Sequence, residues 1–128
     1  MKETLLLYHM PQSILEKIED IAKQLHIDIQ IIDDSQIHET MGYLLSIEGY
    51  PASKPQDKPE DMNQEFIFFA GMSDQQLDIL LQLFQMNDIP KIRYKAMLTK
   101  HNMNYTFIQL YKSVQNEYWQ MSQMSRTD

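Results

Sequence analysis

The chain has 128 residues, of which 43% are hydrophobic, and a formal net charge of -7 at pH 7. This length predicts a single domain, and the hydrophobic fraction is too high for a disordered chain. The sequence contains no cysteine, which excludes disulfides, thiol chemistry and Cys-ligated zinc. We expect a cytoplasmic protein, because the apolar run at residues 5–8 is too short for a signal peptide or a membrane span.

The charge is distributed unevenly. Residues 1–50 hold three Lys against nine acidic residues, whereas residues 66–128 hold six basic against five acidic residues. An acidic chain repels phosphate backbones, so nucleic-acid binding is disfavoured. We therefore expect any site for a small anion to lie in the second half.

The first half predicts two strands and two helices in alternation. They are a strand at 4–10, a helix that begins with a capping box of Ser13 and Glu16, a strand at 27–32, and a helix within 35–47 that Gly42 weakens. Apolar residues of the first helix, including Leu15 and Ile18, recur at helical spacing. Residues 48–65 contain Pro51, Pro55 and Pro59 among polar residues, which predicts a loop.

The second half has the same order. Its predicted elements are a strand at 65–70, a helix capped by Ser73 and Gln76 and ended by Asn87 and Asp88, a strand at 91–98, and a helix capped by Thr106 and Gln109. A shift of 62 residues places Leu15 on Leu77 and Ile27 on Ile89. This match indicates either a repeat or two similar units selected by the same packing.

The predicted fold class is α/β. We expect two β-α-β-α units, at 4–47 and 66–124, that form one roughly four-stranded, mostly parallel sheet with helices packed on it. The alternative is a ferredoxin-like α+β arrangement. The whole chain, 1–128, would be a single domain.

The second half also carries a family resemblance. The residues involved are Phe68-Phe69-Ala70-Gly71-Met72-Ser73-Asp74, Leu77, Ile89-Pro90, Lys95–Thr99, Asn102, Asn104-Tyr105-Thr106 and Leu110. Over residues 66–115 the chain resembles a small, uncharacterised bacterial family, domain of unknown function 3783. That family usually has Pro at the place of Lys100 and Trp at the place of Tyr105. The resemblance implies a bacterial, intracellular protein, and no activity, cofactor or catalytic residue.

Polar residues that follow the predicted strands form one candidate ligand site. If all four strands are parallel, their carboxyl ends meet at one edge, which would carry the following residues: His9, Asp33, Asp34, Gly71, Ser73, Asp74, Thr99, His101, Asn102 and Asn104. Lys91, Arg93 and Lys95 alternate along the last strand and could hold a phosphate or carboxylate. The ligand residues we select are Lys95, Thr99, His101, Asn102, Asn104, Ser73 and Asp74.

Structural roles explain the same residues. Ser73 and Asp74 are typical helix caps, Asn102 and Asn104 are typical turn residues, and lysines often protect edge strands from pairing. The four histidines lack metal-ligand spacing, and the three glycines cannot form a phosphate-binding loop. We therefore expect no metal, no cofactor and no catalytic residue.

The last helix predicts a contact surface. Tyr118, Trp119, Met121 and Met124 lie near its end, and exposed aromatic and Met side chains often mark interfaces. The function that we favour is a binding or regulatory module that acts through protein contacts, as a homodimer or with another protein. The alternative is a sensor or enzyme for a small anion at the strand ends of the second half.

Overall fold

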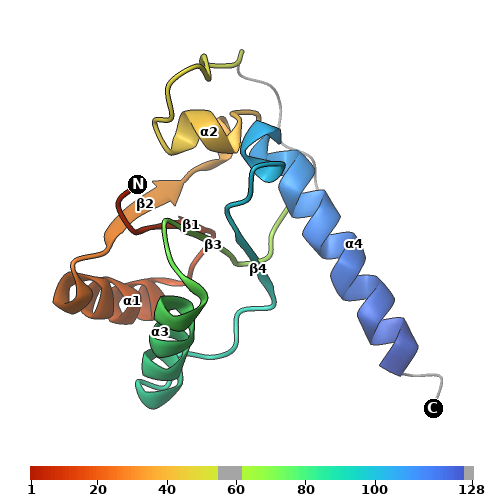
Figure 1. Cartoon of the computed structure of the whole chain (residues 1–128). Coiled ribbons are helices and arrows are strands. Elements are labelled where there is room, and N and C mark those ends of the chain that lie inside the picture. Colours follow the sequence, from red (N-terminus) through yellow and green to blue (C-terminus); the bar gives the residue numbers. More distant parts are fainter. Residues whose placement is uncertain (55–61, 126–128) are drawn as a thin grey trace. The chain divides into compact units, whose positions relative to one another are not determined.

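The computed structural model describes residues 1–54 and 62–125, with the side chains of residues 124 and 125 excepted. The chain divides into two compact units, each built from separated segments. Unit 1 consists of Met1–Ile32 and Gln64–Leu98, and unit 2 of Asp33–Asn63 and Thr99–Asp128. Figure 1 traces the chain and labels the helices and strands of both units.

Unit 1 contains the whole sheet and two of the helices. Its elements are β1 (Thr4–Tyr8), α1 (Gln12–Leu25), β2 (Asp28–Ile32), β3 (Phe66–Ala70), α3 (Asp74–Met86) and β4 (Tyr94–Met97). The strands lie in the order β2-β1-β3-β4. The pairs β1–β2 and β3–β4 are parallel, whereas β1 and β3 are antiparallel. The predicted mixed α/β sheet of four mostly parallel strands is confirmed.

The two halves of unit 1 occupy equivalent positions. A shift of 62 residues takes β1, Thr4–Tyr8, onto β3, Phe66–Ala70. It also takes His26, the left-handed residue after α1, onto Asp88, the left-handed residue after α3. The antiparallel pairing of β1 with β3 centres on Leu6 and Phe68, so the two strand–helix units face each other about a local two-fold relation.

The equivalence ends after the second helix. Asp28 begins β2 and pairs with Thr4, whereas β4 begins at Tyr94, which pairs with Phe66. The second connection is therefore four residues longer than the first. Pro90 stands where Asp28 stands in the first half, and a proline has no N–H to donate to a parallel neighbour. The strand that the sequence predicts at 91–98 consequently starts later than expected.

One face of the sheet packs against α1 and α3, which lie side by side on it (Figure 1). The core on this face joins strand residues with helix residues. Its buried members are Leu5, Leu7, Ile18, Ile21, Ile67, Phe69, Leu80, Phe84 and Ile89. Burial of these apolar side chains holds unit 1 together. Of the apolar helix stripe expected at Leu15 and Ile18, Ile18 is buried in this core and Leu15 is partly buried against it.

The helix starts agree with the sequence in one case and differ in another. Ser73 accepts a hydrogen bond from the backbone of Gln76, whose side chain accepts one from the Ser73 backbone, so the predicted capping box of α3 is confirmed. The capping box expected at Ser13 is wrong. Helix α1 begins one residue earlier, at Gln12, after Pro11, and no side chain caps it.

Unit 2 contains two helices, α2 (Met41–Leu44) and α4 (Phe107–Ser125). The helix expected within 35–47 is shorter in the structure, because a 3₁₀ turn at Asp34–Gln36 precedes α2 and Thr40 caps α2 separately. The Thr106–Gln109 capping box of α4 is confirmed. Residues 48–54 and 62–65 of the predicted loop form neither helix nor strand, and residues 55–61 lie outside the described residues.

Candidate functional site

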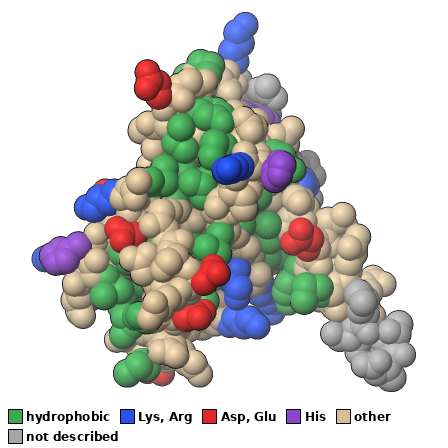
Figure 2. All heavy atoms as spheres, in the orientation of Figure 1, with side chains coloured by type: hydrophobic (Ala, Val, Ile, Leu, Met, Phe, Trp, Pro, Cys, Tyr) green, Lys and Arg blue, Asp and Glu red, His purple; other side chains and the backbone are tan. Residues whose placement is uncertain are grey.

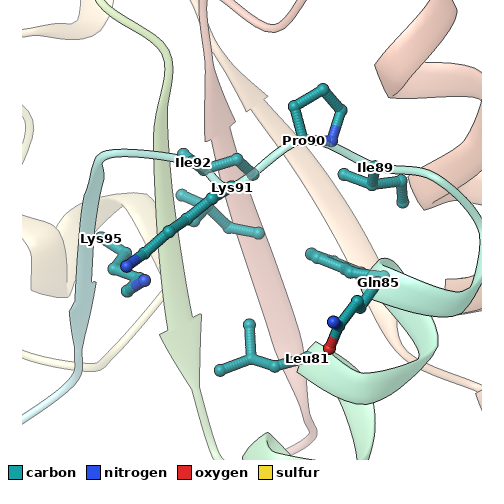
Figure 3. A pocket seen from close by; sticks show the side chains of 9 residues that line it. Leu81, Gln85, Ile89, Pro90, Lys91, Ile92 and Lys95 are labelled. Atoms are coloured by element: carbon teal, nitrogen blue, oxygen red, sulfur yellow. The ribbon is translucent and has the colours of Figure 1, made fainter.

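A pocket of about 390 Å³ opens in unit 1 between α3 and β4 (Figure 3). It is lined by Ile67, Leu81, Phe84, Gln85, Ile89, Pro90, Lys91, Ile92 and Lys95. Six of these nine side chains are apolar, one is an amide and two are lysines. Ligand pockets are typically concave, mostly apolar and roughly 300–1,000 Å³ in volume, with a few polar groups that orient the ligand. The pocket therefore has the size and composition of a small-molecule site.

The long connection between α3 and β4 creates this pocket. After α3 the chain turns at Asp88, which has a φ of 59°, and the N–H of Ile89 donates to the carbonyl of Phe84 at 3.0 Å. The ammonium of Lys17 in α1 lies 3.5 Å from the Asp88 carbonyl. This fixed turn presents Pro90 and Lys91 at the rim before β4 begins. The equivalent turn of the first half leads directly into β2 instead.

The backbone register explains why Lys95 reaches the pocket. Lys95 pairs with Ile67 in the parallel β3–β4 ladder, so both side chains project from the face that α1 and α3 cover. β4 is the last strand of the sheet. A side chain on this face of an edge strand lies at the margin of the helix layer, which lets the Lys95 stem contact apolar residues while its ammonium stays near water.

Positive charge gathers on one side of the pocket. Figure 3 shows the ends of the Lys91 and Lys95 side chains on the same side of the cavity. Burial lowers the pKa of Lys95 below its ordinary value of 10.5, and the neighbouring charge of Lys91 lowers it further. Among the described residues, no carboxylate pairs with either ammonium. In Figure 2, a group of Lys and Arg side chains lies in the lower middle of the face shown, with Asp or Glu side chains directly beside it.

The single edge of polar residues expected for four parallel strands does not form. Because β1 and β3 are antiparallel, the carboxyl ends of β1 and β2 point to one edge of the sheet and those of β3 and β4 to the other. His9, Asp33 and Asp34 follow the first pair of strands, whereas Gly71, Ser73 and Thr99 follow the second pair. The strand order could not be derived from local sequence patterns, which is why the prediction failed here.

The seven selected ligand residues fall in different units. Lys95, Ser73 and Asp74 belong to unit 1, and Thr99, His101, Asn102 and Asn104 belong to unit 2. Of the seven, only Lys95 lines the pocket. Ser73 caps α3, and Asp74 is its first residue. The role of these residues as ligand contacts stays a prediction.

The selected residues of unit 2 stabilise their own turn. The Thr99 backbone donates to the Asn102 side chain at 2.8 Å, and the Asn102 backbone donates to the Thr99 hydroxyl at 3.0 Å. The Tyr50 hydroxyl donates to the Asn104 side chain at 2.8 Å. His101 is exposed. These bonds are what a polar turn needs, and they fit the turn-forming role that the sequence also predicts for Asn102 and Asn104.

The three basic residues 91, 93 and 95 do not share one strand face, because β4 begins only at Tyr94. The structure nevertheless brings Lys91 and Lys95 to one pocket and leaves Arg93 outside its lining. Sequence reasoning missed Leu81, Gln85 and Ile92 as lining residues. The signal that could have found them is Pro90, because a proline there delays the start of the strand, and the first half has no proline at the equivalent position.

The end of α4 exposes large apolar side chains, as the sequence predicts. The exposed fractions are 37% for Tyr118, 56% for Trp119 and 69% for Met121. Met124 belongs to α4, but its side chain lies outside the described ones. Exposed residues of this kind are enriched at protein contacts.

Within residues 1–54 and 62–125, no three or more His, Asp or Glu side chains gather so that they could hold a metal ion. In the same part of the chain, no helix combines the length and the apolar character needed to cross a membrane.

Comparison with known proteins finds one family model that matches part of the chain. Neither the curated proteins nor the solved structures contain a match to this chain. Residues 65–121, from the start of β3 into α4, match the model of one family, described as domain of unknown function (DUF3783), which is the family that the motif Phe68–Asp74 resembles.

Proposed function

We propose that this protein is a binding module whose ligand site is the pocket between α3 and β4. The observation that carries the proposal is the composition of the pocket, in which an apolar lining adjoins two lysines that no described carboxylate neutralises. All nine lining residues fall within residues 65–121, the segment that matches the family model. The proposal includes a bacterial, cytoplasmic location, which the cysteine-free sequence permits.

Binding fits this site better than catalysis does. The lining residues provide two ammonium groups and one amide, so a lysine is the only group among them that could serve as base or nucleophile, and none of them is a carboxylate, histidine, serine or threonine. Such a set can hold and orient a ligand through burial and charge. The small-anion function expected from the sequence is thus retained, with Lys95 kept and Lys91 added, and with the site moved away from the turn at 99–104.

A neutral apolar dye tests the proposal. We expect N-phenyl-1-naphthylamine to bind the wild-type protein with increased fluorescence, and we expect Leu81→Trp, which fills the pocket, to abolish this binding. Ile79→Trp is the matched control, because Ile79 lies on the same helix, is 47% exposed and does not line the pocket. Ile92→Trp provides a second filling variant outside the helix. Far-UV circular dichroism checks that each variant folds.

Two results would overturn the pocket as the ligand site. One is the absence of dye binding to the wild-type protein. The other is equal dye binding by wild type and by a folded Leu81→Trp or Ile92→Trp variant.

The second candidate is the protein-contact function, which the exposure of Tyr118, Trp119 and Met121 favours. Tyr118 and Met121 are three residues apart and so lie on neighbouring parts of the helix surface. We propose that the partner is a second copy of this chain. Size-exclusion chromatography with light scattering should then give a dimer for the wild type and a monomer for Tyr118→Ala/Met121→Ala. A monomeric wild type would reject self-association.

A further inference from the structure

Two exposed lysines stand at one side of the pocket, and no carboxylate of the described residues pairs with either. The side chains of Lys91 and Lys95 end on the same side of the cavity, and the described residues offer neither a carboxylate partner. Neighbouring like charges repel each other, and partial desolvation of Lys95 adds to this cost, while the exposure of both side chains to water screens it. Lys91 belongs to residues 90–93, the four additional residues that precede β4. The first half has no equivalent of these four residues.

The two ammonium groups lie on the side of the pocket next to Ile92, opposite the side chains that α3 contributes, which include the amide of Gln85 (Figure 3). Ile89 and Pro90 lie at the end of α3, and Leu81 lies below them, whereas both ammonium groups lie toward β4 (Figure 3). A ligand that fits both sides needs an apolar body and an anionic group at one end. Two ammonium groups can each donate to one oxygen of a single carboxylate.

We infer that the pocket selects small amphiphilic carboxylates, with the apolar chain against Leu81, Phe84 and Ile89 and the carboxylate between Lys91 and Lys95. This inference rests on the proposed function and adds the ligand class and the residues that choose it. Charge complementarity carries it: the two cationic groups have no described anionic partner, so a ligand carboxylate would supply the missing charge where a neutral or cationic head group would not.

A competing explanation assigns Lys95 to the protection of an edge strand. An inward-pointing charge on an edge strand hinders pairing with other chains, and β4 is such a strand. That explanation gives no role to Lys91, which precedes the strand and forms no part of its ladder. The two explanations therefore predict different behaviour for Lys91 variants.

The experiment compares three ligands with the same chain and different head groups. Decanoate, decanol and decylamine are titrated against the neutral dye bound to the full-length protein. We expect decanoate to displace the dye at about tenfold lower concentration than decanol, and decylamine to be the weakest competitor, because charge-assisted hydrogen bonds favour the carboxylate by about this factor.

Variants of the two lysines identify the groups responsible. Lys91→Met and Lys95→Met should each reduce the advantage of decanoate over decanol toward unity while dye and decanol binding persist. Arg93→Met is the matched control in the same segment and should leave the advantage unchanged, because Arg93 does not line the pocket.

The outcomes separate this inference from the proposed function. Dye binding with equal affinity for decanoate and decanol would reject carboxylate selection and retain the pocket. If both lysine variants keep the preference for decanoate over decanol, the assignment of Lys91 and Lys95 is rejected. If only Lys95→Met has an effect and that effect is aggregation, the edge-strand explanation replaces the inference. Absence of dye binding would reject the pocket itself.

Discussion

Gly71 is the residue at which backbone geometry and packing both require the absence of a side chain. Its φ is 77°, and a Cβ atom built there would lie 2.9 Å from the carbonyl oxygen of Lys2. Gly49 has a comparable φ of 94°, but nothing lies within 4 Å of an added Cβ atom. Substitutions at Gly71 and Gly49 therefore separate the effect of backbone conformation from that of the steric contact with Lys2.

Gly71→Ala should lower the free energy of unfolding by about 2–4 kcal/mol, because left-handed backbone strain of about 1–2 kcal/mol combines with a steric contact to rigid backbone. Gly49→Ala should lose only the strain, about 1–2 kcal/mol. Urea denaturation measures both values. Equal losses would show that the contact with Lys2 contributes nothing.

Lys95 should be a residue whose removal stabilises the protein. Because its pKa is lowered in the folded state, the protonated form is disfavoured there relative to the unfolded chain. The free energy of unfolding must therefore rise as pH increases from the folded pKa of Lys95 toward the ordinary value of 10.5. At neutral pH this destabilisation is fully present.

Lys95→Met should consequently raise the melting temperature at neutral pH, and the gain should shrink as the pH approaches 10.5. Arg93→Met, in the same segment but outside the pocket, is the control and should change the melting temperature less. Differential scanning fluorimetry at the two pH values makes the comparison. A lower melting temperature for Lys95→Met at neutral pH would contradict the expected sign.

The helix caps give a prediction at the scale of elements. Ser73→Ala removes the side chain that accepts a hydrogen bond from Gln76 at the start of α3, and should cost about 1 kcal/mol of stability. Ser13→Ala should change stability by less than about 0.5 kcal/mol, because Ser13 lies within α1 and caps nothing. Thermal unfolding of both variants tests the pair, and a larger loss for Ser13→Ala would contradict the structure.

Local chemistry explains which elements the sequence could predict. The strands at residues 4–8 and 66–70 and the cap of α3 depend on neighbouring residues, so apolar runs and Ser73 were sufficient to find them. The antiparallel pairing of β1 with β3 depends on residues about 60 positions apart and has no local signal. The prediction of one shared polar edge failed for that reason.

The candidate site was predictable only in part for a related reason. The alternation of basic residues predicts an anion site at Lys91, Arg93 and Lys95, and two of these three residues, Lys91 and Lys95, line the pocket. Of the apolar lining residues, Ile89 is buried and also belongs to the core of unit 1, so its place in the pocket has no separate signal in the sequence. A cavity arises where an element is displaced, and the delayed start of β4 is visible only when the two halves of the sheet are compared.

At the scale of the whole molecule, the chain path bears on cooperativity. The chain passes between the two compact units three times, after Ile32, after Asn63 and after Leu98. Each unit therefore consists of segments that are distant in sequence, and neither can form from one continuous piece. Single domains of this length usually unfold in one cooperative transition.

The single-domain prediction can be tested on this basis. Residue-resolved NMR during a urea titration can follow the amides of Phe68 in unit 1 and Tyr111 in unit 2, two residues whose side chains are fully buried. We expect the same midpoint and the same slope for both amides, because loss of either unit releases the chain ends that close the other. Gly71→Ala, placed in unit 1, should lower both midpoints equally. Two separate midpoints, or a shift confined to Phe68, would show that the units are independent domains and that the chain only links them.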